Sequence, residues 1–322
     1  MSVKIALVGC GMWGRNIARN AYELGVLHAV CDTNTDNAAM FAGDFKTESM
    51  TFSDILNASE IDGVIIVTNA VSHQTLACQA LLAGKHVYIE KPLTLSMAAA
   101  NEIAIASDSS KKQVMVGHLI QYHPAFIALK QQVQAGMIGT LKHIQANRLA
   151  MGRIRKSESV IYDLCPHDLS LILGLTGVMP LSVQCHSASH ITSGVADMVA
   201  AGLSFPDKIT AMIHTSWYSP YKEHRLTVTG STGSIVFDDT KPWPEKLMHY
   251  HDNIYNSGDA FQIERTGPIA LHVTPGEPLK DEVRAFVNVC KSGLPALTSL
   301  DEALRVQQIL AEMERQTKEL VE

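Results

Sequence analysis

Cysteine pairs of the C-x-x-C type are absent from this sequence of 322 residues, whose six cysteines are widely scattered. Neither a disulfide framework nor a zinc site is therefore expected, and the pattern is typical of the reducing cytosol. The cysteines are Cys10, Cys31, Cys78, Cys165, Cys185 and Cys290.

Long apolar runs and an excess of basic residues are also missing. No apolar stretch approaches the roughly 18 residues of a membrane span. The first residues lack the basic region, the apolar stretch and the cleavage site of a signal peptide. The formal net charge of −6 argues against a broad basic surface for nucleic acid. We therefore expect a cytoplasmic protein with neither a membrane nor a nucleic acid as partner.

The composition and length are those of an ordinary globular protein with two cores. Hydrophobic residues make up 46% and charged residues 18% of the chain, enough apolar surface to bury a core. A single core rarely grows past roughly 250 to 300 residues. We expect two domains, residues 1–121 and 122–322.

The first half begins with a strand, a glycine turn, a helix, a second strand and an acid. Residues 3–8 form a β-branched apolar run, and Gly9-Cys10-Gly11-Met12-Trp13-Gly14 follows as a G-x-G-x-x-G motif. A helical pattern covers residues 16–24, and an apolar strand over residues 27–31 ends at Asp32. A glycine motif alone could merely shape a loop, but this context indicates a dinucleotide site.

Each glycine has a separate role in such a site. Gly9 permits the tight turn, Gly11 lets the backbone approach a pyrophosphate, and Gly14 lets the helix pack closely on the strand. Met12 and Trp13, inside the motif, are candidate cofactor contacts, and the N-terminus of the helix that follows receives the phosphate charge.

The acid Asp32 predicts the choice of cofactor. A carboxylate there accepts hydrogen bonds from the adenosine ribose and repels a 2′-phosphate, so NAD is expected and NADP less so. The alternative is that Asp32 caps a turn formed by the polar residues after it. Both roles can coexist.

Further strands and helices alternate through the first half. This pattern predicts a doubly wound parallel sheet with its ligand crevice at the carboxyl ends of the strands. Thr68-Asn69 and Glu90-Lys91-Pro92 fall at such ends, and with His73 they are candidate cofactor contacts. The expected strands are 63–67, 86–89 and 114–116, and the expected helices are 74–83 and 98–107.

Together these residues resemble the glucose-fructose oxidoreductase, inositol dehydrogenase and rhizopine-catabolism (Gfo/Idh/MocA) family. The resemblance runs along essentially the whole chain, and its most specific part is Glu-Lys-Pro joined to a later Asp-x-x-x-His. It is carried by Gly9 to Gly14, Asp32, Glu90-Lys91-Pro92, Gly117-His118, Asp163 and His167.

The resemblance implies that Lys91, Asp163 and His167 line a substrate site beside the nicotinamide. Pro92 agrees with this role, because it holds Lys91 in extended backbone at the strand end. Three alternatives stay open: a solvated lysine, a histidine merely hydrogen-bonded at a domain interface, and an aspartate that caps a helix.

The backbone around Asp163 and His167 has two possible forms. A helix that begins near Tyr162 would place both side chains on one face. Proline fits best in a first helical turn, so Pro166 favours a helix that starts only at Cys165 or Pro166. Asp163 would then lie in a loop or act as a cap.

These residues predict hydride transfer from a secondary alcohol to NAD. His167 is the expected base, since a free imidazole has a pKa of about 6.5, and Lys91 is expected to stabilise the developing alkoxide. The histidines and acids show no recognised metal-ligand spacing, and hydride transfer needs no metal. No metal is expected.

In the second half, apolar and polar residues alternate along several stretches, which predicts strands, and turn residues occur at 205–208 and 230–233. This pattern predicts an α+β domain with an open, mostly antiparallel sheet, whose free face could bury another subunit in a homodimer or homotetramer. Two helices at about 281–290 and 299–320 resemble tail helices that pack back on a Rossmann domain, and no chemistry is expected of them. The expected strands are 141–149, 181–189, 198–205, 209–217, 225–229 and 234–238.

A cationic stretch lies between Asn147 and Lys156, where Arg148, Arg153 and Arg155 occur without an acid. Arginine forks match phosphate geometry, which favours a nucleotide diphosphate sugar, with a solvated loop as the alternative. The longer stretch from Asn147 to Asp168 also resembles the nucleotide-sugar branch of the family, which oxidises UDP-N-acetylhexosamines or their uronic acids, commonly at C3, in surface-polysaccharide biosynthesis.

Two further residues, His118 and Tyr122, are candidate substrate contacts. Residues 121–124, Gln-Tyr-His-Pro, depart from that branch, where arginine and asparagine are frequent before the proline. A free-sugar or inositol dehydrogenase therefore stays open, as do glycoside cleavage with recycled NAD and a non-catalytic NAD-binding regulator.

Overall fold

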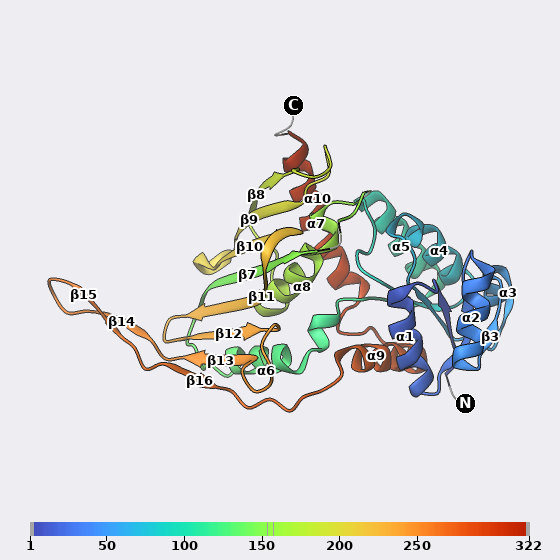
Figure 1. Cartoon of the computed structure of the whole chain (residues 1–322), viewed down its shortest axis with the longest axis horizontal. Coiled ribbons are helices and arrows are strands. Elements are labelled where there is room, and N and C mark those ends of the chain that lie inside the picture. The colour runs from blue at the N-terminus through green and yellow to red at the C-terminus, as the bar shows by residue number, and fades with distance from the viewer. Residues whose placement is uncertain (1–2, 153, 157, 320–322) are drawn as a thin grey trace. The chain divides into compact units, whose positions relative to one another are not determined.

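The computed structural model describes residues 3–152, 154–156 and 158–319 (Figure 1). It divides into two compact units. The first comprises Met1–Tyr122 with Glu277–Gln308, and the second His123–Gly276 with Ile309–Glu322. The last helix, α10 (Leu300–Glu319), therefore contributes residues to both units.

A six-stranded parallel sheet forms the centre of the first unit, in the order β3-β2-β1-β4-β5-β6. This is the strand order of a Rossmann fold and confirms the predicted doubly wound sheet. The strands are β1 (Ile5–Val8), β2 (Leu27–Cys31), β3 (Glu48–Ser49), β4 (Gly63–Ile66), β5 (His86–Ile89) and β6 (Val114–Val116).

Helices cover both faces of this sheet. Alternate residues of each strand point to opposite faces, and both sets are apolar in β1 and must be buried. Ala6 and Val8 of β1 pack in one apolar core with α3, α4, α5 and the start of α10. Ile5 and Leu7 pack in the other core with α1, α2 and α9. The helices are α1 (Met12–Glu23), α2 (Thr35–Phe45), α3 (Phe52–Asn57), α4 (Ala70–Leu82), α5 (Met97–Ser110) and α9 (Pro278–Ser292), with a 3₁₀ turn η1 (Leu119–Tyr122).

The second unit is built on an eight-stranded sheet in the order β16-β13-β12-β11-β7-β10-β9-β8. Among its described strands only β7 and β10 pair in parallel, so the predicted mostly antiparallel sheet is confirmed. Turns at 205–208 and 230–233 join antiparallel neighbours as expected. The strands are β7 (Leu141–Met151), β8 (Ser182–Ala188), β9 (Met198–Ser204), β10 (Thr210–Ser216), β11 (Tyr218–Gly230), β12 (Ser234–Asp238), β13 (Leu247–Tyr250) and β16 (Pro268–Ala270).

Helices α6 (Pro124–Gln134) and α8 (Cys165–Thr176) pack on this sheet, α6 against β12 and α8 against β7 and β10. On β10, Ala211 and Ile213 are buried whereas Thr210 and Met212 are exposed, so the two sides of the strand differ. A separate two-stranded ribbon, β14 (Asn253–Asn256) with β15 (Phe261–Glu264), extends from the end of β13 (Figure 1).

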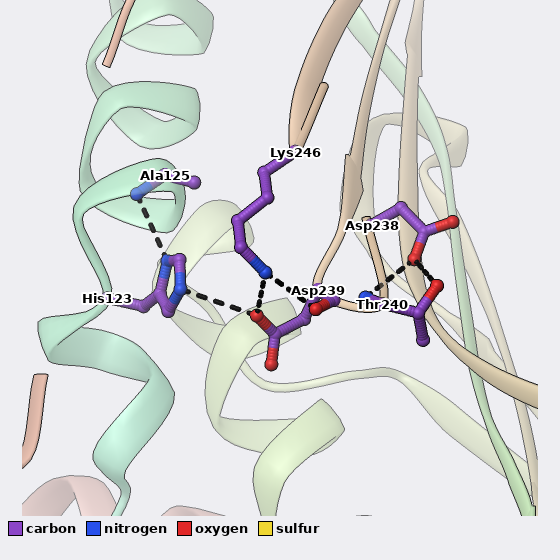
Figure 2. A network of polar contacts seen from close by, with 6 residues as sticks. All are labelled: His123, Ala125, Asp238, Asp239, Thr240 and Lys246. Carbon is purple, nitrogen blue, oxygen red and sulfur yellow. Dashed lines mark hydrogen bonds and ion pairs between the residues drawn. The ribbon is translucent and has the colours of Figure 1, made fainter. Parts of the chain in front are cut away.

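A polar network fixes the start of α6 to the turn between β12 and β13 (Figure 2). His123 caps α6 by accepting the Ala125 N–H on Nδ1 at 3.1 Å, and its Nε2 lies 3.4 Å from Asp239 Oδ1. Lys246 donates to the same oxygen at 2.7 Å. Because Nδ1 accepts a hydrogen bond, the ring hydrogen lies on Nε2, which donates to Asp239.

None of the helices in the described part of the chain combines the length and the apolar character that a membrane crossing requires.

Candidate active site

The glycine loop between β1 and α1 has the geometry that the motif predicts. Gly9 has a φ of +110°, and a Cβ built on it would lie 2.5 Å from the carbonyl oxygen of Val67. A Cβ on Gly14 would overlap the carbonyl oxygen of Gly9. Both positions therefore require glycine, one for the turn and one for close packing of the helix on the strand.

Gly11 differs from the other two glycines. A Cβ there would meet no atom within 4 Å, and Gly11 is the N-cap of α1 without any side-chain cap. The first intrahelical bond runs from the Arg15 N–H to the Gly11 carbonyl, so the amides of Met12, Trp13 and Gly14 belong to the uncapped first turn. Such amides are suited to a pyrophosphate, and the loop fits a dinucleotide.

Asp32, at the end of β2, is bound to the backbone around it. Its Oδ2 accepts the Cys10 N–H at 2.6 Å and its Oδ1 accepts the Asn34 N–H at 2.8 Å. The carboxylate thus ties the glycine loop to the turn after β2, which is the turn role left open above. Each carboxylate oxygen can accept more than one hydrogen bond, so the ribose contact stays a prediction.

The ends of β4 and β5 are joined by His73, a buried residue of α4. Its Nδ1 lies 2.9 Å from the Pro92 carbonyl and its Nε2 lies 3.2 Å from the Thr68 carbonyl. Burial lowers the pKa of His73, and the contacts with backbone carbonyls oppose that fall. His73 therefore fixes Thr68 beside Glu90-Lys91-Pro92, whereas direct contact of His73, Thr68 or Asn69 with a cofactor stays a prediction.

Glu90 links the first helix to the Glu-Lys-Pro segment. Its Oε1 accepts the Trp13 indole N–H at 2.7 Å and the Tyr88 hydroxyl at 2.9 Å, and its Oε2 accepts the Lys91 amide at 3.2 Å. Burial raises the pKa of Glu90, and the hydrogen bonds from Trp13 and Tyr88 oppose that rise. Lys91, which is half-buried, comes directly after Glu90 at the carboxyl end of β5.

His118 and Tyr122 make contacts with the tail of the chain inside the first unit. His118 Nδ1 lies 2.6 Å from Glu302 Oε2, and the Tyr122 hydroxyl lies 3.3 Å from Thr298 Oγ1. Burial raises the pKa of Tyr122 to about 12. Both side chains thus help to hold the tail, and their contact with substrate stays a prediction.

The backbone around Asp163 takes a form between the two that the sequence allows. A short helix, α7 (Val160–Asp163), ends at Asp163, and α8 begins at Cys165 after a break at Leu164. Pro166 lies in the first turn of α8, as proline prefers. His167 is half-buried in that same turn, one helix later than Asp163.

The Asp163 carboxylate is held by two donors rather than used as a helix cap. Its Oδ1 accepts Arg155 Nη2 at 3.0 Å, and its Oδ2 accepts the Trp217 indole N–H at 2.9 Å. Arg155 also pairs with Glu158 at 3.0 Å. Trp217 was not among the site residues predicted from the sequence, although a buried tryptophan N–H requires a partner.

Arg148 is committed to an internal ion pair. Its guanidinium makes three hydrogen bonds of 2.8 to 3.2 Å with Asp168 of α8, and both side chains are buried. Burial raises the pKa of Asp168 and Arg148 opposes that rise. Arg148 therefore joins β7 to the turn that carries His167. Of the other two predicted phosphate contacts, Arg155 binds Asp163, and Arg153 lies outside the described residues.

The described site residues form two groups. Gly9, Trp13, Asp32 and Glu90-Lys91 gather in the first unit, and Asp163, His167 and their partners gather in the second. Across the described ranges, no group of three or more histidine, cysteine or acidic side chains is placed to hold a metal ion.

Comparisons with known proteins cover both units. Residues 3–118 match the model of an oxidoreductase family with an NAD-binding Rossmann fold, and residues 126–236 match the GFO/IDH/MocA C-terminal domain. The UDP-N-acetylglucosamine 3-dehydrogenase of Acidithiobacillus ferrooxidans is 33% identical over 91% of this chain and 90% of its own. An inositol 2-dehydrogenase of Rhizobium meliloti is 26% identical over 75% and 77% of the two chains.

Solved structures agree with these matches. The Acidithiobacillus dehydrogenase superposes over all of both chains with a TM-score of 0.87 and 25% identity. An aldose-aldose oxidoreductase of Caulobacter crescentus shares the fold, with a TM-score of 0.86, 17% identity and coverage of 99% and 98%. The chain belongs to the Gfo/Idh/MocA family of oxidoreductases, whose Rossmann domain binds NAD(P).

Proposed function

We propose that this protein is an NAD-dependent dehydrogenase of a nucleotide sugar. The substrate is a UDP-N-acetylhexosamine or its uronic acid, oxidised at the secondary alcohol on C3. One observation carries the substrate class: the 33% identity to a UDP-N-acetylglucosamine 3-dehydrogenase extends over nine tenths of both chains.

Three side chains of this protein would have separate roles in the oxidation of the alcohol. Bound NAD would supply the hydride acceptor. His167 takes the proton from the substrate hydroxyl, while the Lys91 ammonium hydrogen-bonds the same oxygen and stabilises its developing negative charge. Asp163, held by Trp217 and Arg155, is a fixed carboxylate that orients a sugar hydroxyl or the base.

The assignment of base and stabiliser is tested by two variants in the full-length protein. His167→Ala should lose most of kcat while NAD still binds, and the activity should partly return when imidazole is added. Lys91→Met should also lose kcat but show no rescue by imidazole. If His167→Ala kept most of kcat while Lys91→Met abolished it, the two roles would be exchanged.

The preference for NAD rests on Asp32, whose carboxylate would repel the 2′-phosphate of NADP. Asp32→Asn removes the charge and keeps one of the two hydrogen bonds that the side chain accepts, because the amide oxygen accepts whereas the amide nitrogen only donates. We expect NADP affinity to rise at least tenfold relative to NAD affinity, as measured by calorimetry. Equal NADP affinity in the variant and the wild type would remove the basis for this preference.

A substrate panel decides between the proposed function and its main competitor. The 26% identity to inositol 2-dehydrogenase and the internal pairing of Arg148 with Asp168 favour a free cyclitol or sugar as the second candidate. We expect NADH formation with UDP-N-acetylglucosamine or its uronic acid, and little with myo-inositol, scyllo-inositol or glucose. Turnover of an inositol with no turnover of either UDP-sugar would favour the competitor. NAD binding without turnover of any of them would favour a regulator.

A further inference from the structure

A second buried acid lies behind Glu90, on a helix for which the sequence predicts no chemistry. Glu282 of α9 has no exposed surface. The Tyr88 hydroxyl stands between the two acids, 2.9 Å from Glu90 Oε1 and 3.0 Å from Glu282 Oε2. All three residues belong to the first unit, so their arrangement is internal to it.

The number of hydrogens in this chain of oxygens determines its charge. A phenol carries one hydrogen and can donate to only one of the two carboxyl groups. The other close contact requires that the second carboxyl group itself donate to the Tyr88 oxygen, and only a protonated acid can do so. Two ionised carboxylates on one buried phenol would also repel each other. The pair therefore holds one negative charge.

The surrounding donors indicate which acid is ionised. Glu90 accepts the Trp13 indole and the Lys91 amide besides Tyr88. Glu282 Oε1 has no hydrogen-bond partner among the described residues. Burial, followed by the charge of Glu90, raises the pKa of Glu282 well above its usual range. The phenol of Tyr122 in η1 is also within electrostatic reach of Glu282 and, as a neutral group, offers no compensating positive charge.

We propose that Glu282 is a positioning residue of the cofactor site: as a neutral acid it donates to Tyr88, which in turn donates to Glu90. These two hydrogen bonds, from Glu282 to Tyr88 and from Tyr88 to Glu90, hold Glu90 as a fixed, ionised carboxylate between the Trp13 indole of α1 and the backbone of Lys91. The functional consequence rests on the proposed NAD site, whereas the protonation of Glu282 does not.

Infrared difference spectroscopy of the full-length protein tests the protonation directly. At neutral pH the wild type should show the carbonyl stretch of a protonated carboxylic acid, which Glu282→Gln removes and Glu90→Gln leaves in place. Absence of this band from the wild type, or its loss in Glu90→Gln but not in Glu282→Gln, would overturn the proposal.

Cofactor binding tests the positioning role with a matched pair of variants. Glu282→Gln keeps a neutral donor for Tyr88, so NAD affinity should stay within about twofold of the wild type. The methionine of Glu282→Met has a similar length but no donor, so Tyr88 loses one hydrogen bond. Because Tyr88 in turn donates to the charged Glu90, this loss should lower NAD affinity about tenfold. NAD affinity should fall at low pH as Glu90 becomes protonated. In Glu282→Met this fall should occur at higher pH than in the wild type, because Glu90 is less well stabilised as a carboxylate.

A structural role alone would not separate these two variants in their pH profiles. Equal affinity and equal pH dependence in Glu282→Gln and Glu282→Met would overturn the positioning role. If Glu282→Met does not fold, Tyr88→Phe removes the same bridge and should show the same two effects. Failure of the wild type to bind NAD would count against the proposed function. The infrared result would still show whether Glu282 is protonated.

Discussion

At the scale of single residues, the three glycines of the first loop have different physical requirements. A methyl group on Gly14 would overlap the Gly9 carbonyl, so Gly14→Ala must displace α1 from β1. Overpacking of this kind typically costs about 1 to 3 kcal/mol. We expect the free energy of unfolding to fall by this amount in urea titrations, together with NAD affinity.

Gly11→Ala is the informative partner of that variant. A methyl group there meets no protein atom within 4 Å, so stability should be unchanged. It would nevertheless occupy the position from which backbone approaches a pyrophosphate, and NAD affinity should fall. Gly43→Ala, on α2 and also free of close contacts, is the control that should change neither. Unchanged NAD affinity in Gly11→Ala would contradict the assigned role of that glycine.

Asp163 depends on an indole that lies 54 positions away in the chain. Trp217→Phe keeps an aromatic ring but removes the N–H that Asp163 Oδ2 accepts, which leaves a buried carboxylate oxygen with one donor fewer. We expect a loss of about 1 to 3 kcal/mol in stability and a lower kcat. Trp243→Phe, which alters a ring stacked on His123 instead, should leave kcat unchanged. A wild-type kcat in Trp217→Phe would show that Asp163 needs no such support.

At the scale of elements, the internal ion pair of Arg148 and Asp168 fixes α8 on the sheet. Ile144, Ala146 and Arg148 alternate along β7 on its buried side, so the guanidinium points into the core and needs the Asp168 carboxylate. Removal of one partner of a buried pair costs roughly 3 to 5 kcal/mol. Asp168→Asn should therefore destabilise strongly, and Arg148→Met combined with Asp168→Leu should recover much of the loss. A double variant as unstable as Asp168→Asn would contradict this account.

The link between α6 and the β12–β13 turn should depend on pH (Figure 2). Partial burial acts to raise the pKa of Asp239, but hydrogen bonds from His123 and Lys246 outweigh it and hold this pKa well below its usual range. A lowered pKa means that the stabilisation is complete at neutral pH and is lost as the pH falls below about 4. The stability difference between the wild type and Asp239→Asn should therefore shrink below that pH. The exposed Asp207, changed to Asn, is the control in which no such convergence is expected.

Elements with a clear hydrophobic period could be predicted, whereas elements fixed by caps or distant partners could not. The predicted strands 27–31, 86–89, 114–116 and 234–238 match β2, β5, β6 and β12 to the residue, because their burial follows directly from sequence. Helices α2 and α3 were not predicted, although their N-caps Asn34 and Thr51 are residues that favour helix starts.

The site was predictable only where a local motif carries it. The glycine loop and Glu90-Lys91 follow from short stretches of sequence. The contact of Tyr88 with Glu282 spans 194 positions and that of Glu90 with Trp13 spans 77. Pairings at such separations depend on which helices lie beside the end of β5, α1 for Trp13 and α9 for Glu282, and neither spacing nor composition contains that information.

At the scale of the whole molecule, the free side of the second sheet predicts association with a second copy. Met212, at the centre of β10, is 58% exposed and stands beside Gly202 of β9 and Gln145 of β7. An exposed methionine flanked by a small and a polar residue on the face of a sheet is suited to a subunit interface. Light scattering should give a multiple of the 35.1 kDa chain mass for the wild type and the single-chain mass for Met212→Arg. Met40→Arg, an equally drastic change at a 48% exposed position of α2, should leave the assembly intact. Because a charge at Met212 faces away from the core, the variant should stay folded, and an unchanged mass would assign the interface to another surface.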